Sequence, residues 1–340
     1  MSQPNALRRH NRRQVLELIL DRGGLTRPLL AQHTGLSQVT VNAVVQQLLD
    51  ERVVHLSRGA QQTPGRAAQV VSPAPDLGTV VAIDLQPDML SAQIMSLADQ
   101  SAVSLIQQVA PADLTQASAD LVRTCAHDAR FGPLRGVLIG LPAPVDAAGE
   151  LGEPNAVPHL DVAALRRLGV PVWFENDANL VALAAHAGSP QLTHLAALVE
   201  RASGTGMGFI LGGVLYRGVQ GRAGELGRTP WPHREADVLL EQLSASARLS
   251  ATAYLVAGLC HALDLERVVL SLRGGRGRDL AAQLKGLLPP AVQVVHEPDA
   301  ADAARRGAAA CAVRRCRDRL LAGPESGPRP RGAQGAGHVA

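Results

Sequence analysis

The sequence predicts an α/β protein in which a small helical head precedes a body of two related α/β lobes around a cleft. Three observations predict this organisation. Residues 7–50 have helical periodicity interrupted by short glycine turns, and strand-type and helix-type segments alternate after the proline-rich joint SPAPD at residues 72–76. The strand pairs near residues 80–97 and 195–217 resemble each other, which indicates an internal duplication. We therefore expect three regions, a head, a body and a disordered tail, over residues 1–72, 73–320 and 321–340.

The composition of the chain is that of a cytoplasmic protein with sizeable cores. Of its 340 residues 46% are hydrophobic, yet no apolar run approaches the roughly 20 residues that a membrane helix needs. The first residues, MSQPNALRRHNRRQ, contain no apolar segment of signal-peptide type. The four cysteines form no Cys-x-x-Cys pair, so we expect reduced thiols and no disulfides.

Charge is divided unevenly along the chain, although the formal net charge is only +3. Residues 1–72 and 301–340 each carry a net charge of +5, whereas residues 73–300 carry −7. A basic head on an acidic body indicates that the head meets a polyanion. A solvated charged face is the alternative, because arginine is abundant and Lys285 is the only lysine.

The head contains three helices with recognisable starts and ends. The first is expected over Leu7–Asp21, before a glycine pair. Thr26 can cap the second, which ends at residues 34–36, where a glycine permits a sharp turn. Ser37 caps the third, over residues 37–50, in which valines and leucines form a buried stripe.

The opposite face of the third helix is uncharged and polar, where an ordinary exposed helix face carries Glu and Lys. Its hydrogen-bonding side chains are those of Ser37, Gln38, Thr40, Asn42 and Gln46. Such groups bind base edges, and the intervening Val39 and Ala43 can meet thymine methyl groups. Two helices joined by a glycine turn, the second polar outward, indicate a helix-turn-helix that binds DNA. A small helical domain that mediates only association is the alternative.

A wing is predicted after the third helix. Short strands at residues 52–56 and 67–71 flank the segment 57–66, and Arg58 and Arg66 are expected to enter a minor groove or contact phosphates.

The body is predicted from alternating segments. Its expected strands are 79–85, 90–97, 102–109, 135–141, 171–177, 194–200, 207–213 and 214–218, and its expected helices are 113–129, 161–168 and 178–186. The stretch ASGTGMGFILGGVLYRG at residues 202–218 has two interpretations. Backbone N–H groups between its glycines can cradle a phosphate, or the glycines can serve a tight hairpin.

Four segments of the body resemble a known family. They are LIGLPAPVDAAGEL at 138–151, PN at 154–155, FENDAN at 174–179 and SGTGMGFILGGVLYRGVQGRAGELGR at 203–228. With these motifs, and over about residues 5–315, the chain resembles the ROK family (repressor, open reading frame, kinase), whose fold is two-lobed, actin-like and ribonuclease-H-like. The head is similar to that of the family's regulators, whose winged helix-turn-helix ends in a GR-containing wing like PGRAA at 64–68.

The resemblance implies roles for several side chains. Asp177 matches the catalytic base that takes a sugar hydroxyl proton in the family's kinases, a carboxylate that can equally accept a hydrogen bond from the sugar. Asn155, Asn176 and Glu225 match sugar-contacting positions, and Glu241 matches the glutamate that closes the family's cysteine-rich segment. Amide and carboxylate groups suit a polyol. A helix cap or a surface pair is the alternative for each of them.

Two departures from the family pattern argue against catalysis. In the place of the family's nucleotide-binding Asp-x-Gly-Gly-Thr loop, this chain has DLQPDML at 84–90. A phosphate needs exposed backbone N–H groups there, but this segment has bulky side chains, a proline without an N–H, and the negative charge of Asp88. The zinc-binding His and three Cys are absent, with Arg228 in the histidine position. We therefore expect no enzyme activity, no cofactor and no metal.

The sequence thus predicts a transcriptional regulator of the ROK type, a repressor of sugar-related genes. Its expected partners are double-stranded operator DNA, a sugar or sugar-derivative effector, and further copies of itself in a homodimer or homotetramer. An active ATP-dependent sugar kinase that uses Asp177 is one alternative. A DNA-binding regulator with a vestigial pocket is the other.

Overall fold

The computed structural model describes residues 3–58, 69–233, 236–272, 275–297 and 299–323. The chain divides into two compact units, the first formed by residues 1–75 and 315–340 and the second by residues 76–314. No helix within the described ranges is long and apolar enough to cross a membrane. From residue 324 onward the predicted tail lies outside the described residues.

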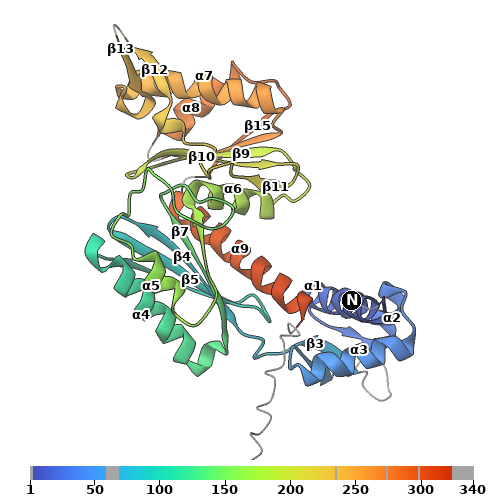
Figure 1. Ribbon diagram of the computed structural model, residues 1–340. Coiled ribbons are helices and arrows are strands. Elements are labelled where there is room, and N and C mark those ends of the chain that lie inside the picture. Colours follow the sequence, from blue (N-terminus) through green and yellow to red (C-terminus); the bar gives the residue numbers. More distant parts are fainter. Residues whose placement is uncertain (1–2, 59–68, 234–235, 273–274, 298, 324–340) are drawn as a thin grey trace, which may run out of the picture. The chain divides into compact units, whose positions relative to one another are not determined.

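The first unit is a winged helix-turn-helix (Figure 1). Its elements are α1 (Gln3–Arg22), β1 (Leu25–Thr26), α2 (Arg27–Thr34), α3 (Gln38–Asp50), β2 (Val54–Arg58) and β3 (Gln69–Pro73). The strands form an antiparallel sheet in the order β1-β3-β2. Strand β2 begins two residues later than the sequence predicted, and β1 was not predicted because two residues leave no periodicity to detect.

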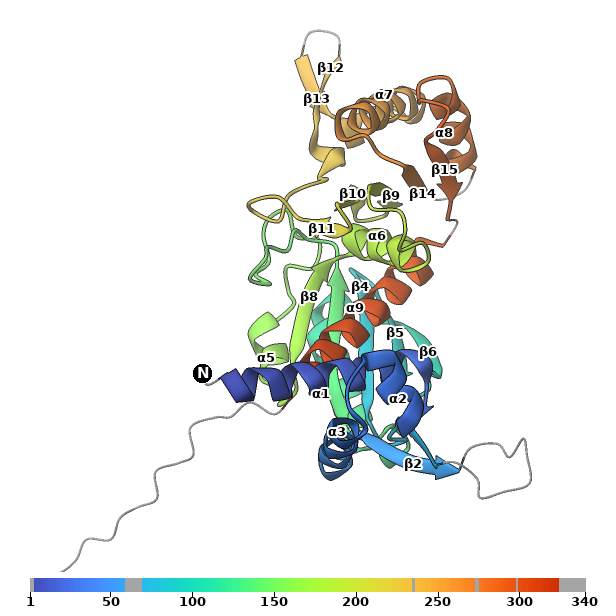
Figure 2. The same cartoon turned by 90° about the vertical axis from the view of Figure 1, so that its right-hand side faces the viewer.

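The helices of the first unit pack through the predicted stripe. Val41, Val45 and Leu48 of α3 are fully buried, as are Leu16 and Ile19 of α1. Figure 2 shows α3 next to strand β2. The turn between α2 and α3 contains Gly35 at φ 69°, a left-handed conformation that favours glycine and ends α2.

The second unit contains two lobes with the same topology. In the first lobe the sheet order is β6-β5-β4-β7-β8, and in the second it is β11-β10-β9-β14-β15. Each sheet begins with an antiparallel three-strand meander and continues with two parallel strands. The strands of the first lobe are β4 (Thr79–Gln86), β5 (Met89–Ser96), β6 (Ala102–Gln108), β7 (Leu134–Leu141) and β8 (Val172–Asn176). Those of the second are β9 (Leu195–Arg201), β10 (Gly204–Leu211), β11 (Val214–Tyr216), β14 (Arg267–Ser271) and β15 (Gln293–His296). The shared topology agrees with the predicted duplication.

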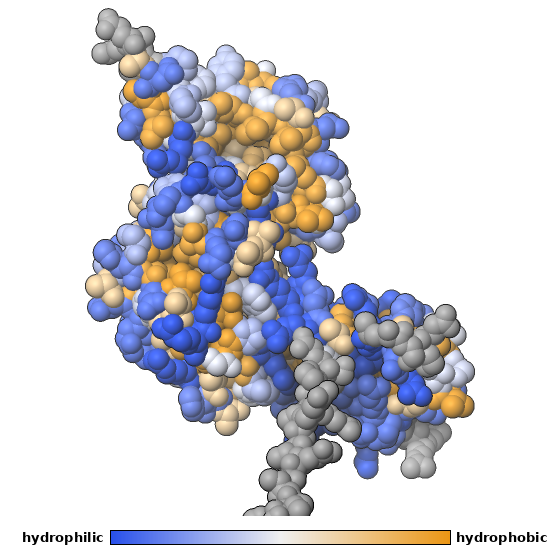
Figure 3. Space-filling model, viewed as in Figure 1, coloured by the Kyte–Doolittle hydropathy of each residue, from blue (hydrophilic) through white to orange (hydrophobic). Residues whose placement is uncertain are grey.

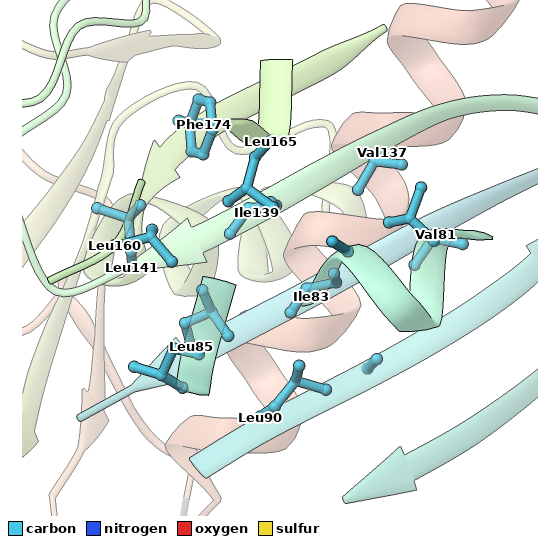
Figure 4. Packing of buried hydrophobic residues seen from close by; sticks show 14 of the residues in the cluster. Val81, Ile83, Leu85, Leu90, Val137, Ile139, Leu141, Leu160, Leu165 and Phe174 are labelled. Atoms are coloured by element: carbon cyan, nitrogen blue, oxygen red, sulfur yellow. The ribbon is translucent and has the colours of Figure 1, made fainter. Parts of the chain in front are cut away.

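Helices cover both faces of the first-lobe sheet. The apolar cluster on one face joins the strands to α4 (Leu114–His127) and α5 (Val162–Arg166), and Figure 4 shows Ile83, Ile139 and Leu165 among its side chains. On the other face runs α9 (Ala300–Ala322), where Arg305 donates a hydrogen bond to Ser91 of β5. Both faces are buried, which explains why β4 is apolar almost throughout.

The second-lobe sheet is covered by α7 (Ala245–Leu263) and α8 (Arg276–Lys285) on its outer face. Helix α6 (Asp177–Ala187) packs against β9 and β10. Its approach is close, since a Cβ on Gly208 of β10 would collide with the Ala178 carbonyl, and a Cβ on Gly307 of α9 would collide with that of Leu180. The glycine-rich stretch is therefore a strand that lets a helix approach its backbone, in agreement with the hairpin interpretation.

Candidate ligand pocket and DNA-binding surface

A cavity of about 170 Å³ opens between the two lobes of the second unit, and all five predicted ligand-binding residues line it. The loop after β7 contributes Asn155, the end of β8 and the start of α6 contribute Asn176 and Asp177, and the segment after β11 contributes Glu225 and Glu241. These residues come from segments far apart in the sequence, so the order of the motifs predicted a site that the fold does assemble. Their role in binding stays a prediction.

The two asparagines of the pocket also hold backbone. Asn176 caps α6, because its Oδ1 accepts hydrogen bonds from the N–H groups of Ala178 (3.0 Å) and Asn179 (3.1 Å), while its Nδ2 donates to Ala143 O (3.1 Å). Asn155 Oδ1 accepts from Val157 N at 2.8 Å. Both amides are thus fixed in orientation, which prepares the remaining N–H positions for a ligand.

The far wall of the pocket is acidic. Burial and the nearby Asp177 raise the pKa of Glu225, an effect that Arg228 opposes and Glu241 reinforces. Glu241 lies close to the glycine-rich strand β10, since its Oε2 is 3.6 Å from the point where a Cβ on Gly204 would lie. Several carboxylate oxygens therefore face one small cavity, an arrangement that suits a ligand with several hydroxyl donors.

The centre of the cleft contains an arginine, Arg201, that no sequence motif marks. Arg201, at the end of β9, is only 6% exposed, and its Nη1 contacts Asp84 Oδ2 at 2.8 Å and Oδ1 at 3.1 Å. Its Nε lies 3.4 Å from Asp177 Oδ2, and its Nη2 donates to Ala300 O at 2.7 Å. One guanidinium group therefore contacts Asp84, Asp177 and the first residue of α9. The two carboxylates are at the acidic positions that a kinase of this fold would use.

A second, uncharged contact lies beside this ion pair. Gln86 donates from Nε2 to Asp177 Oδ2 at 3.2 Å and accepts at Oε1 from Ser203 Oγ at 3.1 Å. Asp177 Oδ1 accepts from Ala178 N at 2.9 Å. The predicted departure at residues 84–90 thus does more than add bulk, because Gln86 occupies an oxygen of the carboxylate that matches the catalytic base.

The electrostatics of the cleft are dominated by burial and by Arg201. Burial is the largest effect on Asp84. It raises the pKa of this carboxyl to about 6, even though Arg201 acts to lower the pKa. Burial acts against the charged form of Arg201, but Asp84 and Asp177 more than offset it, so the pKa of this guanidinium is raised. Arg201 is therefore a permanent cation in the interior of the cleft.

The groups that the family's enzymes hold do not fit the residues present. Phosphoryl transfer needs a divalent cation beside the phosphates, and the carboxylates that would meet it are already bound to Arg201. At the position of the zinc segment the chain forms a hairpin of β12 (Pro230–His233) and β13 (Ala236–Leu239). No cluster of metal-binding side chains occurs within the described ranges.

The first unit presents the predicted recognition face on α3. Gln38, Asn42 and Gln46 are exposed, and Val39 is 79% exposed among them. Ser37 and Thr40 have a local role, because Ser37 Oγ accepts from Thr40 N at 3.1 Å and caps α3. The face of the first unit seen in Figure 3 is largely hydrophilic.

The two predicted wing arginines differ in what the structure shows. Arg58 is exposed at the end of β2. Arg66 lies outside the described residues. Contacts of either with DNA stay predictions.

Comparison with known proteins places both parts of the chain. The model of the ROK family matches residues 91–238, and a model described as winged helix-turn-helix DNA-binding matches residues 8–55. The xylose repressor of Bacillus spizizenii is 26% identical over 228 residues, which cover 64% of this chain and 59% of that protein. The xylose repressor of Caldicellulosiruptor bescii is 24% identical over 243 residues, which cover 67% and 60%. The match spans less than two thirds of the length of either relative.

Solved structures share the fold. A ROK family transcriptional regulator described as a homolog of the E. coli MLC protein superposes with a TM-score of 0.66 at 17% identity, covering 93% of this chain and 98% of that one. A ROK hexokinase from Thermus thermophilus superposes with a TM-score of 0.56 at 22% identity, covering 71% and 99%. The fold is therefore that of a two-lobed, sugar-kinase-like body with a winged helix-turn-helix unit. Within this class, residues 91–238 match the ROK family and residues 8–55 match a winged helix-turn-helix, in line with the resemblance that the motifs indicated.

Proposed function

We propose that this protein is a cytoplasmic DNA-binding transcriptional regulator, a repressor of sugar-related genes, whose body binds a sugar or sugar derivative and catalyses no reaction. The observation that supports it most is the combination, in one chain, of an exposed amide-rich face on α3 with a sugar-sized cavity in which Arg201 holds Asp177. The xylose repressors that the chain resembles support the same class of function.

Asp177 serves in this proposal as a fixed hydrogen-bond acceptor for a bound sugar hydroxyl. Its Oδ2 faces Arg201 and Gln86, and its Oδ1 accepts from Ala178 N. A carboxylate has about four lone-pair sites, so a position stays available for a ligand hydroxyl. Catalysis is disfavoured because Arg201 already pairs with the carboxylates that would meet a divalent cation.

Helix α9 offers a route by which ligand binding acts on the recognition helix. In the second unit Arg201 donates to Ala300 O, in the first turn of α9. In the first unit Arg12, which is buried, donates to Leu320 O (2.8 Å) in the last turn and is also paired with Glu51, which caps α3. A ligand that moves Arg201 would thus disturb a helix whose other end contacts the residue that holds α3.

A homodimer or homotetramer is part of the proposal. A single helix-turn-helix makes few base contacts, and pairing two of them about 34 Å apart lets both meet successive major grooves. Ligand binding would then change operator affinity by favouring one arrangement of the paired heads.

DNA binding is tested by selecting duplexes from a random or genomic pool with the full chain and measuring affinity by fluorescence anisotropy. The double variant Gln38→Ala/Asn42→Ala should lose roughly 1–3 kcal/mol per base contact. Gln116→Ala, at an exposed glutamine of α4, is the matched control and should bind like the unmodified chain. Unchanged operator affinity in the double variant would contradict the docking of α3.

Ligand binding and catalysis are tested separately. Thermal shifts across a panel of sugars and sugar phosphates, with D-xylose included because of the related repressors, should identify a stabilising ligand that Asn155→Ala weakens. A vestigial pocket predicts no shift with any sugar. Phosphorylation of a sugar by ATP at ordinary enzymatic rates would establish the kinase alternative instead.

A further inference from the structure

Asp84 and Asp177 place two carboxylates close together in the interior of the cleft. Both carboxylates are buried, and Asp177 lies close enough to raise the pKa of Asp84. In a phosphoryl-transfer enzyme of this fold such a concentration of negative charge is balanced by a divalent cation. Two uncompensated buried carboxylates would be strongly unfavourable.

Arg201 supplies a cation of the protein itself to this pair. Its guanidinium pairs with both carboxylates, with Nη1 hydrogen-bonded to Asp84 and Nε 3.4 Å from Asp177, and its Nη2 donates to the Ala300 carbonyl. The charge is delocalised and cannot be lost at physiological pH, so it offsets one of the two negative charges under all cellular conditions.

We propose that Arg201 takes the place of the divalent cation in this cleft, so that the pocket closes and binds its ligand without metal or nucleotide. The proposal rests on the proposed function, since it explains how a kinase-like body can serve as a sensor. Arg201 is accordingly a positioning residue: it forms an ion pair with Asp177, Nε to Oδ2 at 3.4 Å, while Asp177 also lines the cavity proposed for the ligand.

Arg201 also borders two cavities of the second unit. It lines the cavity of about 170 Å³ that holds the predicted ligand residues, and it lines a second cavity of about 620 Å³ bordered by Gln86, Asp88 and Asp299. The Gln86–Ser203 hydrogen bond likewise joins a residue that lines the second cavity to one that lines the first.

Removal of the cation provides the test. Arg201→Ala leaves Asp84 and Asp177 as an uncompensated pair of oxygen ligands, the type that Mn²⁺ and Mg²⁺ prefer. In a titration of the full chain with Mn²⁺, followed by the paramagnetic resonance of free Mn²⁺, this variant should bind one ion at least tenfold more tightly than the unmodified protein. Arg201→Lys, which keeps a cation, and Arg201→Ala/Asp84→Asn, which removes a ligand, should not gain this binding. A folded Arg201→Ala protein that binds Mn²⁺ no better than the unmodified chain would overturn the proposal.

A folding defect in Arg201→Ala leads to a second decisive comparison. If the defect arises from the uncompensated charge, adding Asp84→Asn should restore a cooperative unfolding transition. Failure of that double variant to recover would show that Arg201 acts by packing, contrary to the proposal. Operator binding of the unmodified chain, measured on the same preparation, separates these outcomes from a failure of the proposed function.

The unmodified protein gives a third readout. The thermal shift produced by a sugar from the panel should be the same in EDTA, in Mg²⁺, and in Mg²⁺ with a non-hydrolysable ATP analogue. A sugar shift that requires Mg²⁺ or the analogue would contradict the inference even if Arg201→Ala behaves as expected.

Discussion

The β4–β5 hairpin of the first lobe and the β9–β10 hairpin of the second occupy equivalent positions in the two duplicated sheets, yet their chemistry is opposite. The first hairpin contributes Asp84 and Gln86, and the second contributes Arg201 and Ser203. Asp84 pairs with Arg201 and Gln86 with Ser203, and each pair is separated by 117 residues. Residues at matching positions of the two repeats therefore face each other across the cleft.

This complementarity explains how the duplicated scaffold differs from a catalytic one. In a phosphoryl-transfer enzyme both hairpins must leave backbone accessible to phosphates. Here the side chains of the two hairpins satisfy one another, one pair by charge and one by a neutral hydrogen bond. The two hairpins are consequently joined by their own side chains, and each pair can be tested separately.

The charged pair should have the largest effect. Arg201→Ala leaves buried Asp84 without its partner, which typically costs about 3–5 kcal/mol. We expect a loss of that size in the unfolding free energy measured by urea denaturation and circular dichroism. Arg130→Ala, which removes an exposed arginine paired with Asp128, is the control and should leave the transition unchanged. Equal effects of the two substitutions would show that the buried pair contributes no more than a surface pair.

The acidic member of the pair should make stability depend on pH. The pKa of Asp84 is raised from 3.8 to about 6 in the folded protein, so the folded state binds this proton more tightly than the unfolded state. The stabilisation is complete below pH 3.8 and is lost as the pH rises through about 6, by about 3 kcal/mol in total.

Asp84→Asn isolates this contribution. The difference in unfolding free energy between the unmodified chain and Asp84→Asn should fall between pH 4.5 and 6.5 and stay constant above pH 7. A difference that rises over this interval would mean that Arg201 lowers the pKa of Asp84 more than burial raises it.

Sequence patterns predicted the fold well because its signals are local. The apolar runs of β4, β7 and β9 and the cap of α3 at Ser37 are each encoded within a few residues. The duplication was visible because both meanders kept the same spacing of strands. The hairpin at residues 230–239 was not predicted, since the sequence showed only that the zinc ligands are missing.

The candidate site was predictable only where motifs mark it. Asn155, Asp177 and Glu225 were located by their order along the chain, but Arg201 was not, although it directly precedes the glycine segment. In a chain rich in arginine, one more such residue carries no signal. Its partner Asp84 is 117 residues away, so only the folded arrangement of the two lobes shows what it does.

The neutral pair of Gln86 and Ser203 should change the unfolding free energy less than either the Arg201 substitution or the titration of Asp84. Ser203→Ala removes the donor to Gln86 Oε1, and an acceptor left without a partner in a buried cleft costs about 1–2 kcal/mol. Ser101→Ala, at an exposed serine that donates to Asp99, should change the unfolding free energy much less because water replaces the lost bond. Since Gln86 also donates to Asp177, Ser203→Ala should in addition weaken any sugar-induced thermal shift, which a loss of packing alone would leave intact. If Ser203→Ala matched Ser101→Ala in both measurements, the two hairpins would be held together by the Arg201 ion pair alone.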